Sequence, residues 1–145
     1  MTPSAIILLV EDNDDDAELT EIAFKRARIA NKIVRARDGV EALDWLHRRG
    51  PHADRREEEP AVILLDLNMP KMSGIDVLKA IRADERLRRL PVVVLTSSDD
   101  DRDRFSAYDN FANSYIRKPV DHEQFTEAAR ELGLYWLVLN VGPRG

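Results

Sequence analysis

The segment VILLDLNMPKMSG, residues 62–74, places a single acidic residue directly after a run of apolar ones. Four successive apolar residues without polar alternation are typical of a strand that is covered on both faces. Asp66 would then lie at the carboxyl end of this strand, and Pro70 marks the turn that follows it. The segment therefore predicts a carboxylate at the tip of a buried strand.

Apolar runs of the same kind recur on both sides of this segment, and residues of helical period separate them. The predicted strands are 5–10, 33–34 with their flanks, 61–65, 91–95 and a weaker one at 113–119. The predicted helices are 14–29, 38–48, 73–83 with Ser73 as N-cap, 99–109, and a last one from residue 121. Five alternations of strand and helix predict an α/β domain, a parallel sheet with helices on both faces.

Length and composition indicate one compact domain. The chain has 145 residues and 43% of them are hydrophobic, which is too apolar for a disordered protein. We expect a single domain over 1–145, with its core at about 4–137 and a C-terminal extension at 138–145. The long polar connection at 48–60 is predicted to be a solvated insertion.

Charge and residue usage exclude several classes of function. The net charge of −5 argues against a broad surface for nucleic acid or anionic membranes. The chain has no cysteine, and its three histidines, His47, His52 and His122, lack metal-ligand spacing. The first apolar run is too short for a signal peptide or a membrane span, so a cytoplasmic location is expected. The arginines at 82, 86, 88 and 89 are interpreted as a solvated face.

Polar side chains follow the predicted strands at their carboxyl ends, where open parallel sheets bind ligands. In the flavodoxin-like strand order 2-1-3-4-5 the first and third strands are neighbours, so Glu11, Asp12 and Asp66 should converge. Three carboxylates at close range require a cation to offset their repulsion. Oxygen ligands and few carboxylates favour Mg²⁺, with Glu11 and Asp12 holding the ion.

Two further strand ends complete a site for phosphoryl transfer. Lys118 adds a positive charge and Thr96 a hydroxyl group, and with the metal they would hold the oxygens of a phosphoryl group. Asp66 would then be the nucleophile that forms an aspartyl phosphate.

Four segments carry a resemblance to a known family: LLVEDN at 8–13, LLDLNMPKMSG at 64–74, LTSS at 95–98 and SYIRKPV at 114–120. Together they resemble the response-regulator receiver domain, which has the CheY-like (βα)5 fold. The resemblance implies phosphorylation of Asp66, and a metal held by Glu11, Asp12, Asp66 and the backbone carbonyl of Asn68. Mg²⁺ would be the ion and Mn²⁺ could replace it. Glu11 stands where many relatives have aspartate, which affects metal affinity.

The same resemblance assigns roles to the later strand ends. Thr96 matches the switch hydroxyl and phosphate ligand, Tyr115 the switch aromatic, and Lys118 the phosphate-binding lysine. The bond before Pro119 is expected to be cis.

The C-terminal segment ELGLYWLVLN, residues 131–140, resembles that of single-domain regulators that partner bacterial and cyanobacterial phytochromes. This resemblance implies a phytochrome-type sensor histidine kinase as partner. Five successive apolar residues at 135–139 cannot all face one side of a helix. We therefore predict a homodimer whose interface includes Tyr135, Trp136 and Val138.

The sequence thus predicts a stand-alone response regulator of a phosphorelay, a signalling protein rather than an enzyme. One alternative is a Mg²⁺-dependent phosphatase with an aspartyl nucleophile, but that chemistry needs a second acid two residues on, where this chain has Asn68. A nucleotide-binding domain is disfavoured because no glycine-rich loop follows a strand. A receiver-like scaffold that works without phosphorylation is the third alternative.

Overall fold

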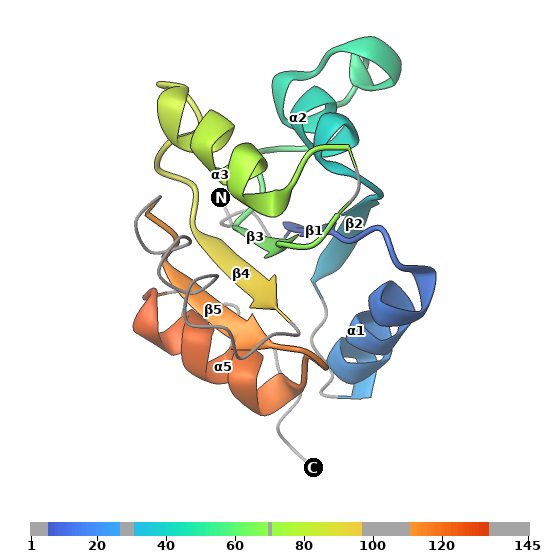
Figure 1. Ribbon diagram of the computed structural model, residues 1–145, viewed down its shortest axis with the longest axis vertical. Coiled ribbons are helices and arrows are strands. Elements are labelled where there is room, and N and C mark those ends of the chain that lie inside the picture. Colours follow the sequence, from blue (N-terminus) through green and yellow to red (C-terminus); the bar gives the residue numbers. More distant parts are fainter. Residues whose placement is uncertain (1–5, 27–30, 70, 97–110, 134–145) are drawn as a thin grey trace.

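The described part of the chain forms one five-stranded sheet with helices on both faces (Figure 1). The computed structural model describes residues 6–26, 31–69, 71–96 and 111–133. The strands are β1 (Ile6–Val10), β2 (Lys32–Ala36), β3 (Val62–Asp66), β4 (Val92–Thr96) and β5 (Ser114–Arg117). The helices are α1 (Asp14–Arg26), α2 (Gly39–His47), the short 3-10 helix η1 (Gly50–His52), α3 (Gly74–Ala83) and α5 (His122–Glu131). The sheet order is β2-β1-β3-β4-β5 and every pairing is parallel, which confirms the predicted fold.

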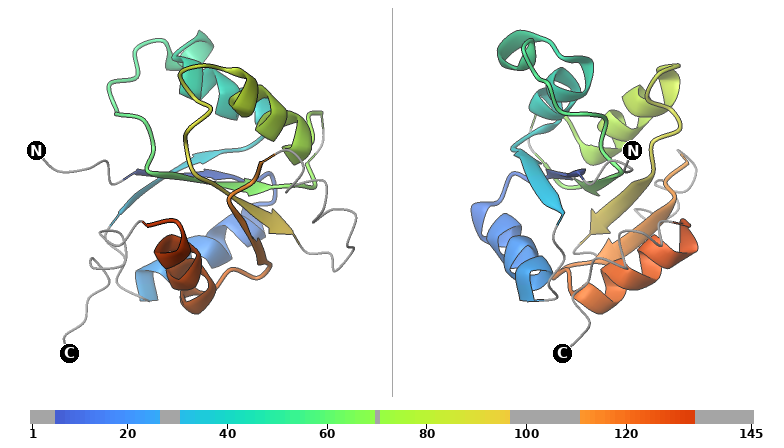
Figure 2. Two further views of the ribbon diagram at one scale, coloured as in Figure 1. Left: turned by 90° about the vertical axis from the view of Figure 1, so that its left-hand side faces the viewer. Right: turned by 180° about the vertical axis from the view of Figure 1, so that it is seen from behind.

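Two apolar layers fill the space between the sheet and the helices. Helices α2 and α3 cover one face, and α1 and α5 cover the other (Figures 1 and 2). Successive residues of β1 alternate between the layers, so Leu8 packs under α2 and α3, whereas Ile7 packs under α1 and α5. Between α1 and α5, the rings of Phe24 and Phe125 lie 4.6 Å apart. Burial on both faces explains why the three central strands, β1, β3 and β4, read as continuous apolar runs.

Side-chain caps fix where the helices begin. Ser73 accepts a hydrogen bond from the backbone N–H of Asp76, which confirms it as the N-cap of α3. Asp38 and Asp121 cap α2 and α5 in the same way. The helix predicted at 99–109 lies outside the described residues.

The connection at 48–60 is exposed or partly exposed over most of its length, as predicted for a solvated insertion, but it is anchored by the buried Arg55. The side chain of Arg55 is 1% exposed, and it donates hydrogen bonds to the carbonyl of Trp45 at 2.9 Å and to Glu59 at 2.7 Å. Its guanidinium also lies 3.9 Å from the centroid of the Trp45 ring. Arg55 can be buried because its charge is paired and its plane is stacked.

Arg86, Arg88 and Arg89 are exposed, as the prediction of a solvated face requires, whereas Arg82, within α3, is only partly exposed. Arg82 donates hydrogen bonds to the carbonyls of Arg88, Leu90 and Phe111 at 2.8–3.0 Å. Arg86 bonds to the carbonyl of Leu46 at 2.6 Å and pairs with Glu59. These two guanidinium groups form hydrogen bonds to several backbone segments. The pattern of charges along the sequence does not reveal this role.

The end of β3 is in close contact with the start of α3. The backbone N–H of Gly74 donates to the carbonyl of Leu67 at 3.1 Å. A Cβ atom at Gly74 would overlap the carbonyl oxygen of Asp66 and lie 2.6 Å from the Cα of Leu67. Glycine is therefore required for this approach, which fixes the backbone at the carboxyl end of β3.

Candidate functional site

Three acidic side chains converge at the carboxyl ends of β1 and β3. Glu11 and Asp12 directly follow β1, and Asp66 is the last residue of β3. One carboxylate oxygen from each lies within 4.8 Å of the others. Glu11 and Asp66 are each 1% exposed, whereas Asp12 is partly exposed. These oxygen ligands could hold a hard divalent cation that water reaches from one side.

Lys118 places its ammonium group among these acids. Its Nζ atom lies 2.7 Å from Oε1 of Glu11 and 3.3 Å from Oδ2 of Asp66. The backbone N–H of Lys118 donates to the carbonyl of Thr96 at 2.8 Å, which joins the end of β5 to that of β4. The peptide bond between Lys118 and Pro119 is cis.

Burial and crowding shift the pKa values of this cluster. Burial, together with the Asp66 carboxyl group, raises the pKa of Glu11 to about 7, and Lys118 partly opposes the shift. For Lys118, burial acts to lower the pKa, but contacts with Glu11, Asp66 and Asp16 outweigh it and raise the pKa above its usual value. The lysine therefore stays charged at neutral pH.

The other predicted site residues lie around this cluster. Thr96 ends β4, the strand next to β3, and is 1% exposed. Tyr115 is half-buried on β5 and packs against the apolar layer under α2 and α3. Asn68 is exposed, and its backbone N–H donates to Oδ1 of Asp66 at 3.1 Å. The metal role of Asn68 and the switch role of Tyr115 stay predictions, and Tyr135, Trp136 and Val138 lie outside the described residues.

Asp16 and Arg35 contact the site, although the sequence analysis gave them no role. Oδ2 of Asp16 lies 3.1 Å from Nζ of Lys118. Arg35, on β2, donates two hydrogen bonds to the carbonyl of Glu11, at 2.9 and 3.0 Å. Asp12 precedes α1 and Asp16 lies within it, so no helical periodicity in the sequence could have linked the two.

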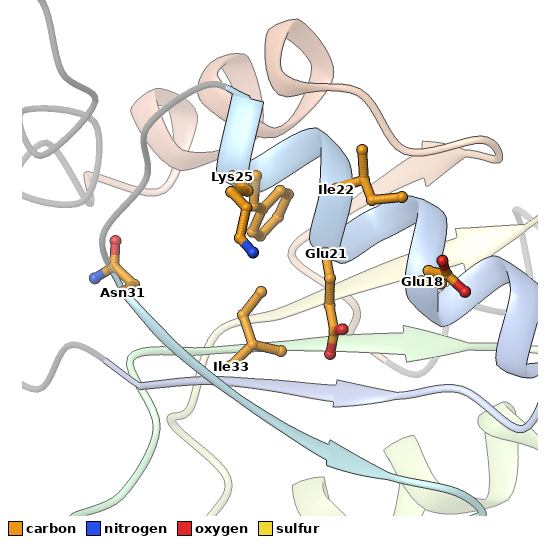
Figure 3. A pocket seen from close by; sticks show the side chains of 7 residues that line it. Glu18, Glu21, Ile22, Lys25, Asn31 and Ile33 are labelled. Atoms are coloured by element: carbon orange, nitrogen blue, oxygen red, sulfur yellow. The ribbon is translucent and has the colours of Figure 1, made fainter.

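A pocket of about 510 Å³ lies apart from the acidic cluster, between α1 and the start of β2 (Figure 3). It is lined by Glu18, Glu21, Ile22, Phe24, Lys25, Asn31 and Ile33. None of the polar residues discussed above contributes to it, so it is not part of the candidate site.

Comparison with known proteins identifies the family of this chain. Residues 7–130 match the family model of the response regulator receiver domain. The chain belongs to this family. Receiver domains act in two-component signalling, so the chain is a response-regulator signalling protein.

The similarity extends to named relatives over most of their length. The chain is 44% identical over 138 residues to the probable methanogenesis regulatory protein FilR2 of Methanothrix harundinacea, covering 95% of this chain and 87% of FilR2. Among solved structures, the bacteriophytochrome response regulator AtBRR is 44% identical with a TM-score of 0.86, covering 93% of this chain and 96% of AtBRR.

Two further structures record states of related regulators. The phosphorylated cyanobacterial phytochrome response regulator RcpA is 37% identical with a TM-score of 0.77, covering 98% of this chain and all of RcpA. The Mn²⁺-bound response regulator Rcp1 is 34% identical with a TM-score of 0.73, covering 93% of this chain and 95% of Rcp1. The chain is thus homologous to phytochrome response regulators. Among the described residues, no helix has the length and apolar character needed to span a membrane.

Proposed function

We propose that this chain accepts a phosphoryl group on Asp66 from a sensor histidine kinase, with Mg²⁺ bound beside it. The observation that carries the proposal is the convergence of Asp66 with Glu11 and Asp12, with Lys118 3.3 Å from Asp66. A related regulator, RcpA, has been solved in a phosphorylated form, which supports the same chemistry here.

The transfer step balances as a simple displacement at phosphorus. A carboxylate oxygen of Asp66 attacks the phosphorus atom of a phosphohistidine, the new O–P bond forms, and the N–P bond breaks. The imidazole nitrogen leaves with the electron pair. Lys118 neutralises negative charge on the transferred group, and the Thr96 hydroxyl is proposed to bind one of its oxygens.

The acidic cluster fits a resident divalent ion. Glu11, Asp12 and Asp66 offer only oxygen ligands, and the single ammonium of Lys118 does not balance their charge. We propose that these carboxylates and the carbonyl of Asn68 hold Mg²⁺, which Mn²⁺ can replace. Binding of a divalent ion is supported by the Mn²⁺-bound form in which Rcp1 has been solved. When bound, the ion supplies positive charge to the phosphoryl oxygens.

Phosphorylation is proposed to change the surface that the domain presents to partners. The new charge on Asp66 would attract the Thr96 hydroxyl and so reposition Tyr115 on the neighbouring strand. This mechanism requires two conformations whose balance the phosphoryl group shifts.

The remaining assignments follow from homology and from the sequence. A phytochrome-type kinase is proposed as partner because of the similarity to AtBRR and RcpA. We also propose a single signalling domain over 1–145 that acts in the cytoplasm as a homodimer, through contacts of Tyr135, Trp136 and Val138. Binding of nucleic acid or membrane is not expected, given the net charge of −5.

Intact mass measurement tests the phosphoacceptor directly. Wild-type protein, Asp66→Asn and the control Asp76→Asn are incubated with acetyl phosphate and Mg²⁺. The control removes an exposed carboxylate in the first turn of α3. We expect wild type and the control to gain one phosphoryl group and Asp66→Asn to gain none. Equal labelling of Asp66→Asn would refute the proposal, and steady hydrolysis of the donor without labelling would favour the phosphatase alternative.

A further inference from the structure

Asp16 reaches the site from the first turn of α1, and the helix does not need its side chain to begin. The backbone N–H of Asp16 donates to Oδ1 of Asn13 at 2.9 Å, so Asn13 is the helix cap. The backbone carbonyl of Asp16 accepts from the hydroxyl of Thr20 at 3.0 Å. The carboxylate of Asp16, 40% exposed, is left to contact Lys118.

The ammonium group of Lys118 is surrounded by as many carboxylates as it has N–H donors. A lysine ammonium has three donors. Its Nζ atom lies 2.7 Å from Glu11, 3.1 Å from Asp16 and 3.3 Å from Asp66, and these acids come from three different segments of the fold. The contact with Asp66 is the longest of the three. An arriving phosphoryl oxygen can bind the ammonium only by weakening one of these contacts.

We propose that Asp16 is a positioning residue that competes with the phosphoryl group for Lys118 and so weakens phosphoryl binding at Asp66. This inference rests on the proposed function. In the unphosphorylated protein, Asp16 gains a partly buried ion pair and holds the ammonium toward α1. Once a phosphoryl group is present, it draws the ammonium away and repels the Asp16 carboxylate. Asp16 therefore stabilises the unphosphorylated form more than the phosphorylated form.

An Asp16 variant that lacks the negative charge tests whether Asp16 competes with the phosphoryl group for Lys118. Asp16→Asn keeps the shape of the side chain and an oxygen acceptor, but it removes the charge. Asp15→Asn removes the same charge from the neighbouring residue, which is exposed. Both variants carry the same net charge and lose one acid from the first turn of α1. A difference between them therefore reports contact with Lys118 rather than overall charge or the helix dipole.

The probe is beryllofluoride, a phosphoryl analogue that binds without a covalent step, at saturating Mg²⁺ and excess fluoride. Affinity is measured by ¹⁹F NMR from the bound fluorine signals. We expect Asp16→Asn to bind about fivefold more tightly than wild type, the lower end of typical coupling between sites. Asp15→Asn should match wild type, and Asp16→Glu should return the affinity toward wild type.

The outcomes separate this inference from the proposed function. If wild type neither binds beryllofluoride nor is labelled by acetyl phosphate, the proposed function and the role of Asp16 are both refuted. If wild type does both, but Asp16→Asn binds no more tightly than Asp15→Asn, the competition alone is refuted. Recovery of wild-type affinity in Asp16→Glu, which restores the charge, would exclude a merely structural effect.

Discussion

Lys118 carries the positive charge that partly neutralises the acidic residues of the site. Two of the acids it contacts, Glu11 and Asp66, are almost fully buried, where unpaired charge is unfavourable. Burial first, and the Asp66 carboxyl second, raise the pKa of Glu11 to about 7, and Lys118 opposes only part of this shift. A divalent cation would supply the missing charge.

Removing one carboxylate should weaken the stabilisation that Mg²⁺ gives. A ligand that binds only the folded state raises unfolding free energy by about 2.7 kcal/mol at a hundredfold excess over its Kd. We expect millimolar Mg²⁺ to raise the unfolding temperature of wild type, and Asp12→Asn to lose most of that increase. Asp15→Asn, in the same segment, should keep it. Differential scanning calorimetry with and without Mg²⁺ measures the unfolding temperature of each protein. If Mg²⁺ raises the unfolding temperature of Asp12→Asn as much as that of wild type, the predicted ligand set is contradicted.

The sequence predicts which residue types lie at the strand ends. It does not predict every side chain that contacts Lys118. Asp66 and Glu11 follow apolar runs that fix their position in the sheet. Asp16 instead depends on how α1 is rotated and on where a lysine on a distant loop points. Neither property leaves a periodic signal, so the Asp16 contact was found only in the structure.

At the scale of elements, the connection from α2 to β3 is held by paired charges. Glu59 accepts from Arg55 at 2.7 Å and also pairs with Arg86, which comes from the segment after α3. Arg55 in addition stacks on Trp45 of α2. The connection is thus packed against the helices on this face of the sheet.

Arg55→Ala should therefore be strongly destabilising. The change removes hydrogen bonds to Trp45 and Glu59 and the stacking on the ring, so we expect a loss of about 2–4 kcal/mol of unfolding free energy. Arg56→Ala, at the exposed neighbouring residue, should change it by less than about 0.5 kcal/mol. Urea unfolding of the two variants measures the difference. Similar midpoints for both would show that the Arg55 contacts contribute little.

The central strands β1, β3 and β4 were predictable to within one residue because burial on both faces leaves uninterrupted apolar runs. The edge strands β2 and β5 are only partly buried, and their apolar runs are correspondingly shorter. The anchoring of 48–60 was not predictable, because Arg55, Glu59 and Arg86 read as ordinary surface charges. Their pairing depends on two loops meeting in space, which a one-dimensional pattern does not record.

At the scale of the whole molecule, the strand order makes the site possible. Placing β1 next to β3 brings Glu11 beside Asp66, since the register pairs Val10 with Leu65. The alternation of strands and helices predicted a parallel sheet, and its strand order was expected from the flavodoxin-like fold and from the resemblance to receiver domains. Given that order, convergence of the acids was predictable. The C-terminal segment proposed to form the dimer lies beyond the described residues.

The oligomeric state can be tested by a charge placed in the apolar C-terminal segment. We expect light scattering to give a dimer mass for wild type and a monomer mass for Trp136→Glu, because a buried unpaired carboxylate is unfavourable in an interface. The control is Leu19→Glu, which charges an apolar side chain that is 51% exposed on α1, and should leave the dimer intact. A monomeric wild type at high concentration would refute the proposed homodimer.

Asp16 and Lys118 are separated by 102 residues, yet their charged groups meet beside Asp66. A ribosome-bound chain in which β5 has not yet been synthesised lacks Lys118, so it cannot complete the cluster. The capacity to accept a phosphoryl group would thereby arise late in synthesis, once the residue that follows β5 has reached the ends of β1 and β3.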